Sequence, residues 1–433
     1  MRTKIADFGK SNIVTLIFAA LCVFSISFSG QSTEFIFQEI ITRLCRNVVL
    51  ILALLMPVLC GMGLNFSIVL GAAAGQIGLI CITHWGIGGA GGMTVCILIG
   101  TVLSIGLGFL AGCVFNRTVG QEMITGMIIG YFSKGVFDLI FLVLVGSALI
   151  PIVDPNLILS TGVGLKNTID FNENVCYVFD HVLQLSLIDT VYFALIASAV
   201  ILAALVMWKT LKMHRPVKKS FLECRRTVTV TVCLAAGYVA LPIVPGFYEA
   251  SIAAQVPVFT CVLIALVCLL NVFLSHTKLG QDIRSCGQDM QVAAAAGIKV
   301  GQTRIIATII STVIASWGQI IYLQNMGLVN TYTSHEQVGM YAVAALLVGG
   351  ASLRKATIGQ VFLGALLFHI LFFTMPLAGL NLFNDAQIGE YFRVFISYGI
   401  IAISLALYVW KELAEKKRAL QRVQRNTVPT GSG

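Results

Sequence analysis

Charged residues are scarce in this chain. Only 11% of its 433 residues are Asp, Glu, Lys or Arg, whereas 58% are hydrophobic and the mean hydropathy is +0.92. An average soluble domain carries about 25% charged residues, so this composition excludes a soluble domain whose whole surface is exposed to water. The apolar runs are continuous and about 20 residues long, which suits helices that cross a hydrocarbon core of about 30 Å. A β-barrel would instead show alternating segments of about ten residues. The sequence therefore predicts an all-α, polytopic transmembrane helix bundle.

Motifs for metal, redox and nucleotide chemistry are also lacking. The 12 cysteines show no C-x-x-C spacing and lie mostly inside apolar runs, where we expect free packing residues. The six histidines are scattered, and His84 and His369 have no neighbour at metal-ligand spacing. The stretch KIADFGKS, from Lys4 to Ser11, has a lysine where a Walker A loop needs its first glycine. We expect no catalytic residue, no metal ligand and no cofactor in this chain.

Three basic segments predict the orientation in the membrane. They are the N-terminus (1–11), an internal block (209–226) and the tail (411–433), and basic loops favour the cytoplasmic side. We therefore expect both termini to be cytoplasmic. The formal charge of +9 is then explained by helix ends facing anionic lipid, and nucleic-acid binding is not expected. The N-terminus also resembles a signal peptide, but we expect an uncleaved first helix.

The apolar runs predict about ten membrane helices plus short re-entrant or interfacial pieces, or twelve crossings. The run from Gly339 to Gly350 is too short for a comfortable span. The acidic segment 151–187 is predicted to be extracytoplasmic, either as a cap over the outer mouth or as a docking surface for a soluble partner. The clearest spans are Asn12–Gly30, Asn47–Leu64, Phe66–Trp85, Met93–Phe115, Met123–Ile150, Ile188–Trp208, Val228–Pro245, Ile252–Leu274, Ile305–Gln324, Thr357–Phe373 and Phe392–Trp410.

A polar interruption, 275–304, is predicted to be a cytoplasmic loop with a short helix. It contains the stretch LGQDIRSCGQDMQVAAAAGIKVGQTR. Asp289 can cap a helix, the alanines from Ala293 to Ala296 favour one, and Gly297 can end it in a left-handed conformation. A helix with such a small-residue face suits a groove on another protein, although a plain interhelical loop is the alternative.

This loop resembles the cytoplasmic loop of permease subunits in the ribose and branched-chain amino acid family of bacterial ABC importers. In those permeases the loop holds the coupling helix that inserts into the ATPase. This chain departs from the family's pattern at Gln288 and Met290. It implies a separate ABC ATPase that binds ATP and Mg²⁺, an extracytoplasmic substrate-binding protein, a second permease subunit as homo- or heterodimer, and a location in the bacterial cytoplasmic (inner) membrane. The residues implied in ATPase coupling are Arg284, Gly287, Asp289, Ala293, Ala294, Ala295, Gly297 and Ile298.

Three further stretches are similar to the same family. Gly61–Gly78 is similar to its second-helix region, and Ala342–Leu367 to its glycine-rich segment. Within the latter, Gly359, Gly364 and Ala365 are expected to permit close helix approach in lipid. The stretch Gly120–Phe132 resembles a motif of the simple-sugar and nucleoside branch.

Polar residues within the apolar runs mark the predicted solute pathway. Each is costly in lipid and normally faces the bundle interior or a watery cavity, so it could bind a solute hydroxyl or hold helices together. Lys134 and Asp138, spaced i, i+4, are expected to neutralise each other. The predicted pathway residues are Asn65, Ser67, Gln76, Ser316, Gln319, Gln324 and Asn325.

Together these features predict one transmembrane permease domain, 1–433, that forms part of an ABC importer. An ion-coupled secondary transporter is the alternative, with Lys134 and Asp138 as its evidence. A membrane enzyme would need clustered His, Asp or Glu, which the chain lacks. The scarcity of charge favours a small neutral polar solute such as a monosaccharide or nucleoside, with a branched-chain amino acid or a vitamin as alternatives.

Overall fold

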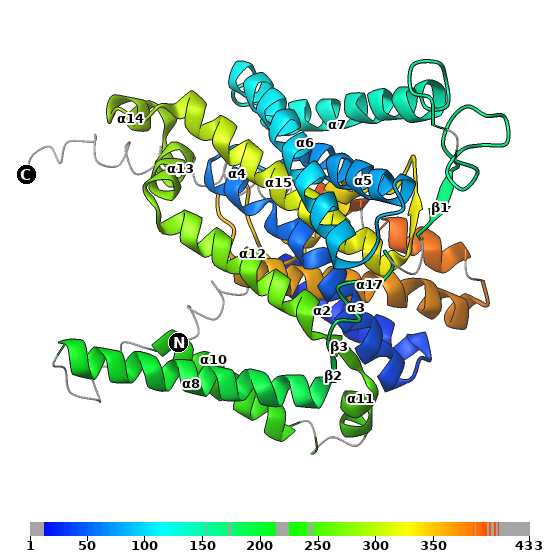
Figure 1. Cartoon of the computed structure of the whole chain (residues 1–433). Coiled ribbons are helices and arrows are strands. Elements are labelled where there is room, and N and C mark those ends of the chain that lie inside the picture. Colours follow the sequence, from blue (N-terminus) through cyan, green and yellow to red (C-terminus); the bar gives the residue numbers. More distant parts are fainter. Residues whose placement is uncertain are drawn as a thin grey trace, which may run out of the picture. The chain divides into compact units, whose positions relative to one another are not determined.

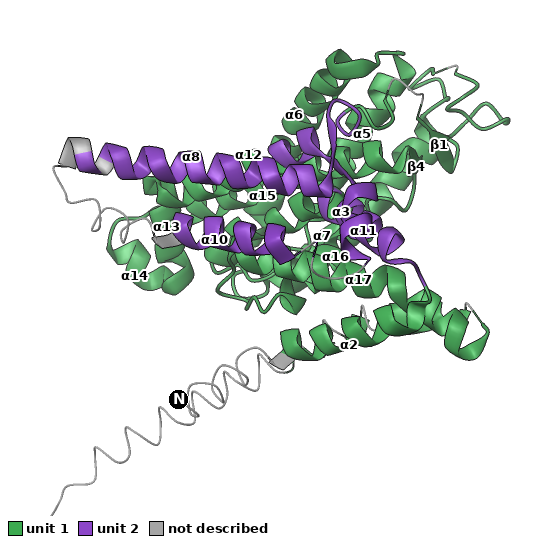
Figure 2. Cartoon of the chain, turned by 90° about the horizontal axis from the view of Figure 1, so that it is seen from below, with its two compact units in different colours: residues 1–30, 46–178, 264–433 green, residues 31–45, 179–263 purple. Residues whose placement is uncertain are grey.

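The computed structural model (Figure 1) describes residues 13–152, 154–171, 175–213, 225–240, 242, 246–385, 387–395, 398–399, 402–403 and 406. The predicted all-α class is confirmed: helices dominate these residues, and sheet is limited to two pairs of three-residue strands. The chain divides into two compact units, coloured separately in Figure 2. Unit 1 comprises 1–30, 46–178 and 264–433, and unit 2 comprises 31–45 and 179–263.

Unit 1 contains most of the helices. Its central helix, α15, packs against α5 and α6 because glycines let the backbones approach closely. A Cβ on Gly75 would lie 2.5 Å from the Ser316 carbonyl oxygen, and one on Gly112 would lie 2.9 Å from Ile305 Cα. The helices are α2 (Ile13–Ser29), α4 (Leu55–Leu59), α5 (Ile68–His84), α6 (Gly89–Arg117), α7 (Glu122–Leu139, followed by a π-helix, Ile140–Leu144), α13 (Lys278–Gln288), α14 (Met290–Ala295), α15 (Val300–Met326), α16 (Val338–Val348) and α17 (Ile358–Phe383).

Unit 2 is built around the long apolar helix α8 (Leu187–Met213) and the shorter helix α10 (Arg225–Ala240), which pack against each other. The short helix α11 (Phe247–Ala253) follows, and β2 (Gln184–Ser186) pairs antiparallel with β3 (Gln255–Pro257). Two further helices, α3 (Thr33–Leu52) and α12 (Val258–His276), have residues in both units.

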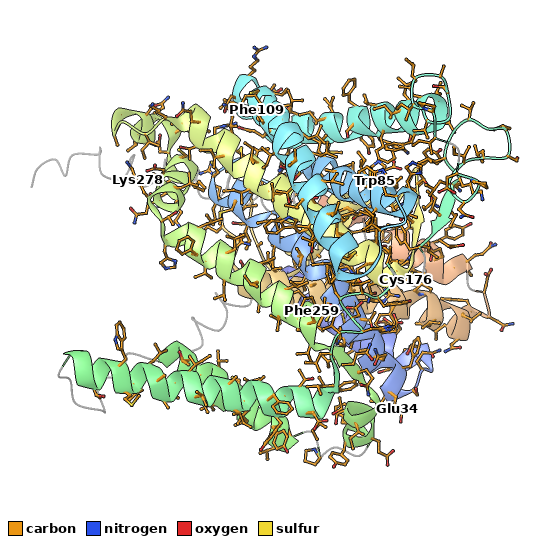
Figure 3. All side chains as sticks on the ribbon, viewed as in Figure 1. Glu34, Trp85, Phe109, Cys176, Phe259 and Lys278 are labelled. Atoms are coloured by element: carbon orange, nitrogen blue, oxygen red, sulfur yellow. The ribbon has the colours of Figure 1, made fainter. Side chains whose placement is uncertain are left out.

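The described residues include six helices long and apolar enough to cross a membrane, plus four shorter apolar helices. Large apolar side chains cover the outside of α6 and α7: Val102 is 70% exposed and Phe132 is 71% exposed. Phe109, labelled on α6 in Figure 3, is 50% exposed. Such a surface is stable against lipid tails and unstable against water. The protein is a multi-pass membrane protein.

Some predicted spans differ from the helices. The prediction of one span over Asn47–Leu64 is wrong, because α3 ends at Leu52 and only the five-residue α4 follows before α5. Pro57 lacks a backbone donor, and Gly61 and Gly63 take positive φ angles of 77° and 70°, which a continuous helix does not allow.

Three other predicted spans also differ in extent or lie partly outside the described residues, as do the three basic segments. The span predicted from Met123 ends at Leu144, and the one predicted from Ile252 becomes a long helix only at Val258. Most of 209–226, part of Phe392–Trp410, and all of 1–11 and 411–433 lie outside the described residues.

The described part of the 151–187 segment is attached to the connector between α15 and α16. Strand β1 (Thr168–Asp170) pairs antiparallel with β4 (Leu328–Asn330). Thr331 N–H donates to the Asn167 carbonyl at 2.8 Å, and the Tyr332 hydroxyl donates to the Leu165 carbonyl at 2.7 Å. The segment is therefore held in place by backbone pairing.

Candidate functional site

The segment between α12 and α15 forms two helices, α13 and α14, which lie beyond the first turn of α15 (Figure 1). Lys278, labelled in Figure 3, begins α13. The predicted cap at Asp289 is confirmed: its carboxylate accepts from the amides of Gln291 (2.8 Å) and Val292 (3.1 Å). Gly297 follows α14 with φ of 84°, the left-handed conformation expected after a helix.

Helix α14 has one buried face and one exposed face. Ala293 is only 2% exposed and belongs to a hydrophobic cluster with residues of α4, α6, α13 and α15. Ala294, Ala295 and Ala296 are exposed. Val292 is also exposed (65%), so a partner that packs on α14 would meet one larger apolar side chain among the small alanines.

Two glycines seat α13 against the segment after α4. A Cβ on Gly287 would overlap the Leu59 carbonyl oxygen, and a Cβ on Gly61 would lie 2.9 Å from Gly287 Cα. Gly287 belongs to the loop that resembles the family's coupling loop, and Gly61 begins the stretch similar to the family's second helix. These stretches, far apart in the sequence, therefore meet in space. Arg284 is exposed, and Ile298 is half-buried against the same cluster.

The first group of predicted pathway residues surrounds Asn65, which is 3% exposed. Its Oδ1 accepts from the Ser67 amide at 3.0 Å and from the Ser67 hydroxyl at 2.6 Å. Its Nδ2 donates to Ser311 Oγ on α15 at 3.3 Å. The amide therefore links the start of α5 to α15.

The second group surrounds Gln76 on α5, which is fully buried. Gln76 Nε2 donates to the Thr331 carbonyl at 2.7 Å, so its Oε1 is the atom that faces His335 Nδ1 at 3.1 Å. The imidazole Nδ1 must then carry the proton. Gln319 Nε2 donates to the Ser334 carbonyl at 3.3 Å. Within the described residues, Gln319 Oε1, His335 Nε2 and the hydroxyl of Ser316, another predicted pathway residue, have no hydrogen-bond partner.

The third group lies at the end of α15. Asn325 Oδ1 accepts from Arg46 Nε at 2.7 Å, and the Gln324 carbonyl accepts from the Tyr177 amide at 2.9 Å. The seven predicted pathway residues are thus buried (0–8% exposed) in separate polar groups between helices. The side-chain hydrogen bonds of Asn65, Gln76, Gln319 and Asn325 join separate segments of the chain, and the solute-pathway role of the seven residues stays a prediction.

Lys134 has a different partner from the one predicted. Its Nζ lies 2.6 Å from Glu336 Oε2 on the α15–α16 connector, so Lys134 pairs with Glu336 rather than with Asp138. The pair joins α7 to the connector that also holds His335. Among the described residues, no group of three or more His, Cys, Asp or Glu could hold a metal ion.

Sequence reasoning missed one buried ion pair. Arg304 on α15 and Glu122 on α7 are 1% and 8% exposed, and Arg304 Nη2 lies 2.6 Å from Glu122 Oε1. The sequence does contain a clue. Glu122 is the only acidic residue between Glu39 and Asp138, and Arg304 is the only Lys or Arg between Lys299 and Arg354. Isolated opposite charges at the ends of apolar runs could have suggested a pair.

We expect His335 to make the protein less stable in mild acid. His335 lies in the connector outside the helices, and its burial lowers the pKa of the imidazole from 6.5 to about 4. The neutral imidazole is therefore the stable form. Stability from this group is complete above pH 6.5 and is lost as the pH falls toward 4. The expected loss between pH 7 and pH 5 is about 2 kcal/mol.

The measurement is the thermal unfolding midpoint in nanodiscs at pH 7 and pH 5. The matched variant is His335→Asn, which can place a donor near the Nδ1 position and does not titrate. Its midpoint should change less with pH than that of the wild type. An equal change in both proteins would contradict the assignment to His335.

Comparisons with known proteins agree with the loop geometry. Over residues 45–404 the chain matches the family described as branched-chain amino acid transport system, permease component. The high-affinity branched-chain amino acid transport system permease protein LivH of Salmonella typhimurium is 27% identical over 118 residues, 27% of this chain and 38% of LivH. The probable ABC transporter permease protein y4mJ of Sinorhizobium fredii is 29% identical over 150 residues, 33% of this chain and 44% of the relative. The autoinducer 2 import system permease protein LsrC of Enterobacter sp. is 33% identical over 94 residues, 21% of this chain and 27% of LsrC.

The matching part of the chain spans less than half the length of each of these relatives. No solved structure matches the chain. The family match is broader, because its bounds, 45–404, run from α3 past α17 and enclose the α13–α14 segment. The predicted resemblance is confirmed at this level: the chain belongs to the branched-chain amino acid transport system permease component family of ABC transporter permeases.

Proposed function

We propose that this chain is the transmembrane subunit of an ABC importer, driven by a separate ATPase and supplied by an extracytoplasmic substrate-binding protein. The observation that supports this proposal is the geometry of helix α14. The helix is capped at Asp289, anchored through Ala293, and open along Ala294 to Ala296. A short rigid helix with a bare face is suited to seating in a groove of the ATPase, which supplies the ATP and Mg²⁺ sites.

The proposed setting is the bacterial inner membrane, with a second permease subunit completing the pathway. Both termini and the 275–304 loop are assigned to the cytoplasm on the distribution of basic residues. The segment 151–187 is assigned to the outer side. Its attachment to β4 and Thr331 supports the role of a cap.

The proposed solute is small and has no net charge. The buried polar groups of unit 1 at the centre of α5 and α15 are amides and hydroxyls, and the ion pairs lie toward helix ends. A monosaccharide or nucleoside fits this description, and so does a zwitterionic branched-chain amino acid, the solute class that LivH's name states. Uptake of D-ribose and L-leucine by cells expressing the chain would separate these classes.

The ATPase assignment is tested by substituting the open face of α14. Ala294→Glu and Ala295→Glu should leave the fold intact, because both sites are exposed and glutamate is a good helix former. The new charge would be buried in the ATPase contact, where an unpaired charge and overpacking cost at least about 1 to 3 kcal/mol. At about 1.4 kcal/mol per tenfold, docking should weaken several-fold or more.

The measurement is vanadate-sensitive ATP turnover that co-purifies with the tagged chain from native membranes. Wild type should retain it, and the glutamate variants should lose most of it while remaining monodisperse. Ala295→Ser is the matched control for a small side chain, and Ala295→Gln separates bulk from charge. The absence of co-purifying ATP turnover with wild type would refute the importer assignment, and full turnover with both glutamate variants would show that α14 is only a connector.

A further inference from the structure

The guanidinium of Arg304 touches the ends of three other helices at once. Its Nη2 donates to Glu122 Oε1, on the first residue of α7, at 2.6 Å, and to the Phe115 carbonyl in the last turn of α6 at 3.0 Å. Its Nη1 lies 3.1 Å from Met290 Sδ, on the first residue of α14. Arg304 itself lies near the start of α15. One side chain therefore joins α6, α7, α14 and α15.

The charges suit the helix ends that they touch. The N-terminus of α7 carries a partial positive charge that favours the Glu122 carboxylate, and the C-terminus of α6 carries a partial negative charge that favours the Arg304 guanidinium. The planar guanidinium presents several donors in fixed directions, so it can hold three partners in one geometry.

Stability alone does not explain this pair. Arg304 and Glu122 are 1% and 8% exposed, so both charges have lost nearly all their water. Well-packed apolar residues often stabilise such a site as well as a buried ion pair does. An apolar pair would position α6, α7 and α14 by shape alone, whereas the planar guanidinium also aims its donors in fixed directions at all three helices.

In the described part of the chain, no other hydrogen bond or ion pair attaches α14 to α7. Ala293 anchors α14 through apolar contacts with Phe115 and Ala307, which would tolerate sliding. Among the described residues, the side-chain hydrogen bond that connects α14 with another helix runs from Arg304 to Met290, and the same guanidinium donates to Phe115 on α6 and to Glu122 on α7. The Arg304 guanidinium is thus a hydrogen-bonded link between α14 and α7, beside the apolar contact that Ile129 of α7 makes with the same cluster.

We propose that the Arg304–Glu122 pair is a positioning device that holds the coupling helix α14 in register with α6 and α7 and passes its movement to α7. This inference rests on the proposed function where it concerns the ATPase. The positional part concerns the chain alone. The two parts can therefore fail separately.

The test replaces both charges, Arg304→Met together with Glu122→Met, so that no unpaired charge remains. Methionine fills irregular space, and the double variant should remain monodisperse. The first measurement is hydrogen–deuterium exchange of the chain alone in nanodiscs. Amides of Met290–Ala296 should exchange about tenfold faster in the double variant, since α14 loses its tie. Unchanged exchange in α14 would overturn the proposal, whatever the ATPase does.

The second measurement uses the complex purified with its ATPase. Vanadate trapping should change exchange in the first turns of α7 in wild type, and should leave α7 unchanged in the double variant while the ATPase stays bound. An equal response in both proteins would overturn the transmission role. If no ATPase co-purifies with wild type, the proposed function fails and the first measurement still decides the positional part.

Two controls keep the result interpretable. Glu39→Met with Arg43→Met removes an ion pair of similar length (2.7 Å) on α3 and should leave α14 exchange unchanged. Arg304→Lys keeps the charge but lacks the fork that spans three partners. This single variant keeps the test decisive if the double variant is unstable. It should speed α14 exchange several-fold, and wild-type exchange would show that position depends on charge alone.

Discussion

Replacing Gly364 by alanine is expected to separate α16 from α17 and to reduce the yield of folded protein sharply. A Cβ at Gly364 would overlap the Ala345 carbonyl oxygen and lie 3.0 Å from the Gly349 amide nitrogen. Both of these atoms belong to the backbone, so no change of side-chain rotamer can relieve the overlap. Overpacking of this kind costs about 3 kcal/mol or more, at the upper end of the usual range.

The matched variant is Gly359→Ala in the same helix. No described residue lies within 4 Å of a Cβ placed there, so within the described part of the chain the expectation that Gly359 also permits close approach is wrong. Its substitution should be neutral or stabilising by about 0.5 kcal/mol, because alanine favours helix. Thermal unfolding followed by size-exclusion chromatography should show a midpoint lower by about 5 °C for Gly364→Ala only. Equal midpoints for the two variants would contradict the packing argument.

The contrast between Gly359 and Gly364 shows which features of the fold the sequence alone can predict. A continuous apolar run can predict its helix closely. The run Phe66–Trp85 predicts a helix there, and α5 spans Ile68–His84. Composition does not reveal which residue of a small-residue motif meets another helix. That depends on Ala345 and Gly349 being brought to Gly364 by the turn between α16 and α17.

The site was predictable where its chemistry is local. Asp289, the alanines and Gly297 lie within nine positions, and capping follows from that spacing. The role of Gln76 was not predictable, because its partner Thr331 is 255 residues away, and an isolated amide in an apolar run looks the same whether it binds a solute or a carbonyl. The Arg304–Glu122 ion pair was not predicted for the same reason, because the two residues are 182 positions apart.

Gly287→Ala is expected to move the α13–α14 segment and to weaken ATPase binding more than it weakens the membrane bundle. The new Cβ would overlap the Leu59 carbonyl oxygen at the end of α4, and Gly61 lies on the other side of the same contact. Helix α13 must then shift away from α4, and α14 follows it because only Asp289 separates the two helices.

The control is Gly106→Ala on α6, where a Cβ would have no described residue within 4 Å. Both variants should insert into the membrane and elute as single species, because the contact at Gly287 lies outside the helices of the central packing. Co-purified vanadate-sensitive ATP turnover should fall at least several-fold for Gly287→Ala and stay at the wild-type level for Gly106→Ala. A Gly287→Val variant should bind less ATPase still, since a larger side chain displaces α13 further. Wild-type turnover in both Gly287 variants would show that the seat of α13 does not set the position of α14, and the coupling role of this segment would then depend on Arg304 and Ala293 alone.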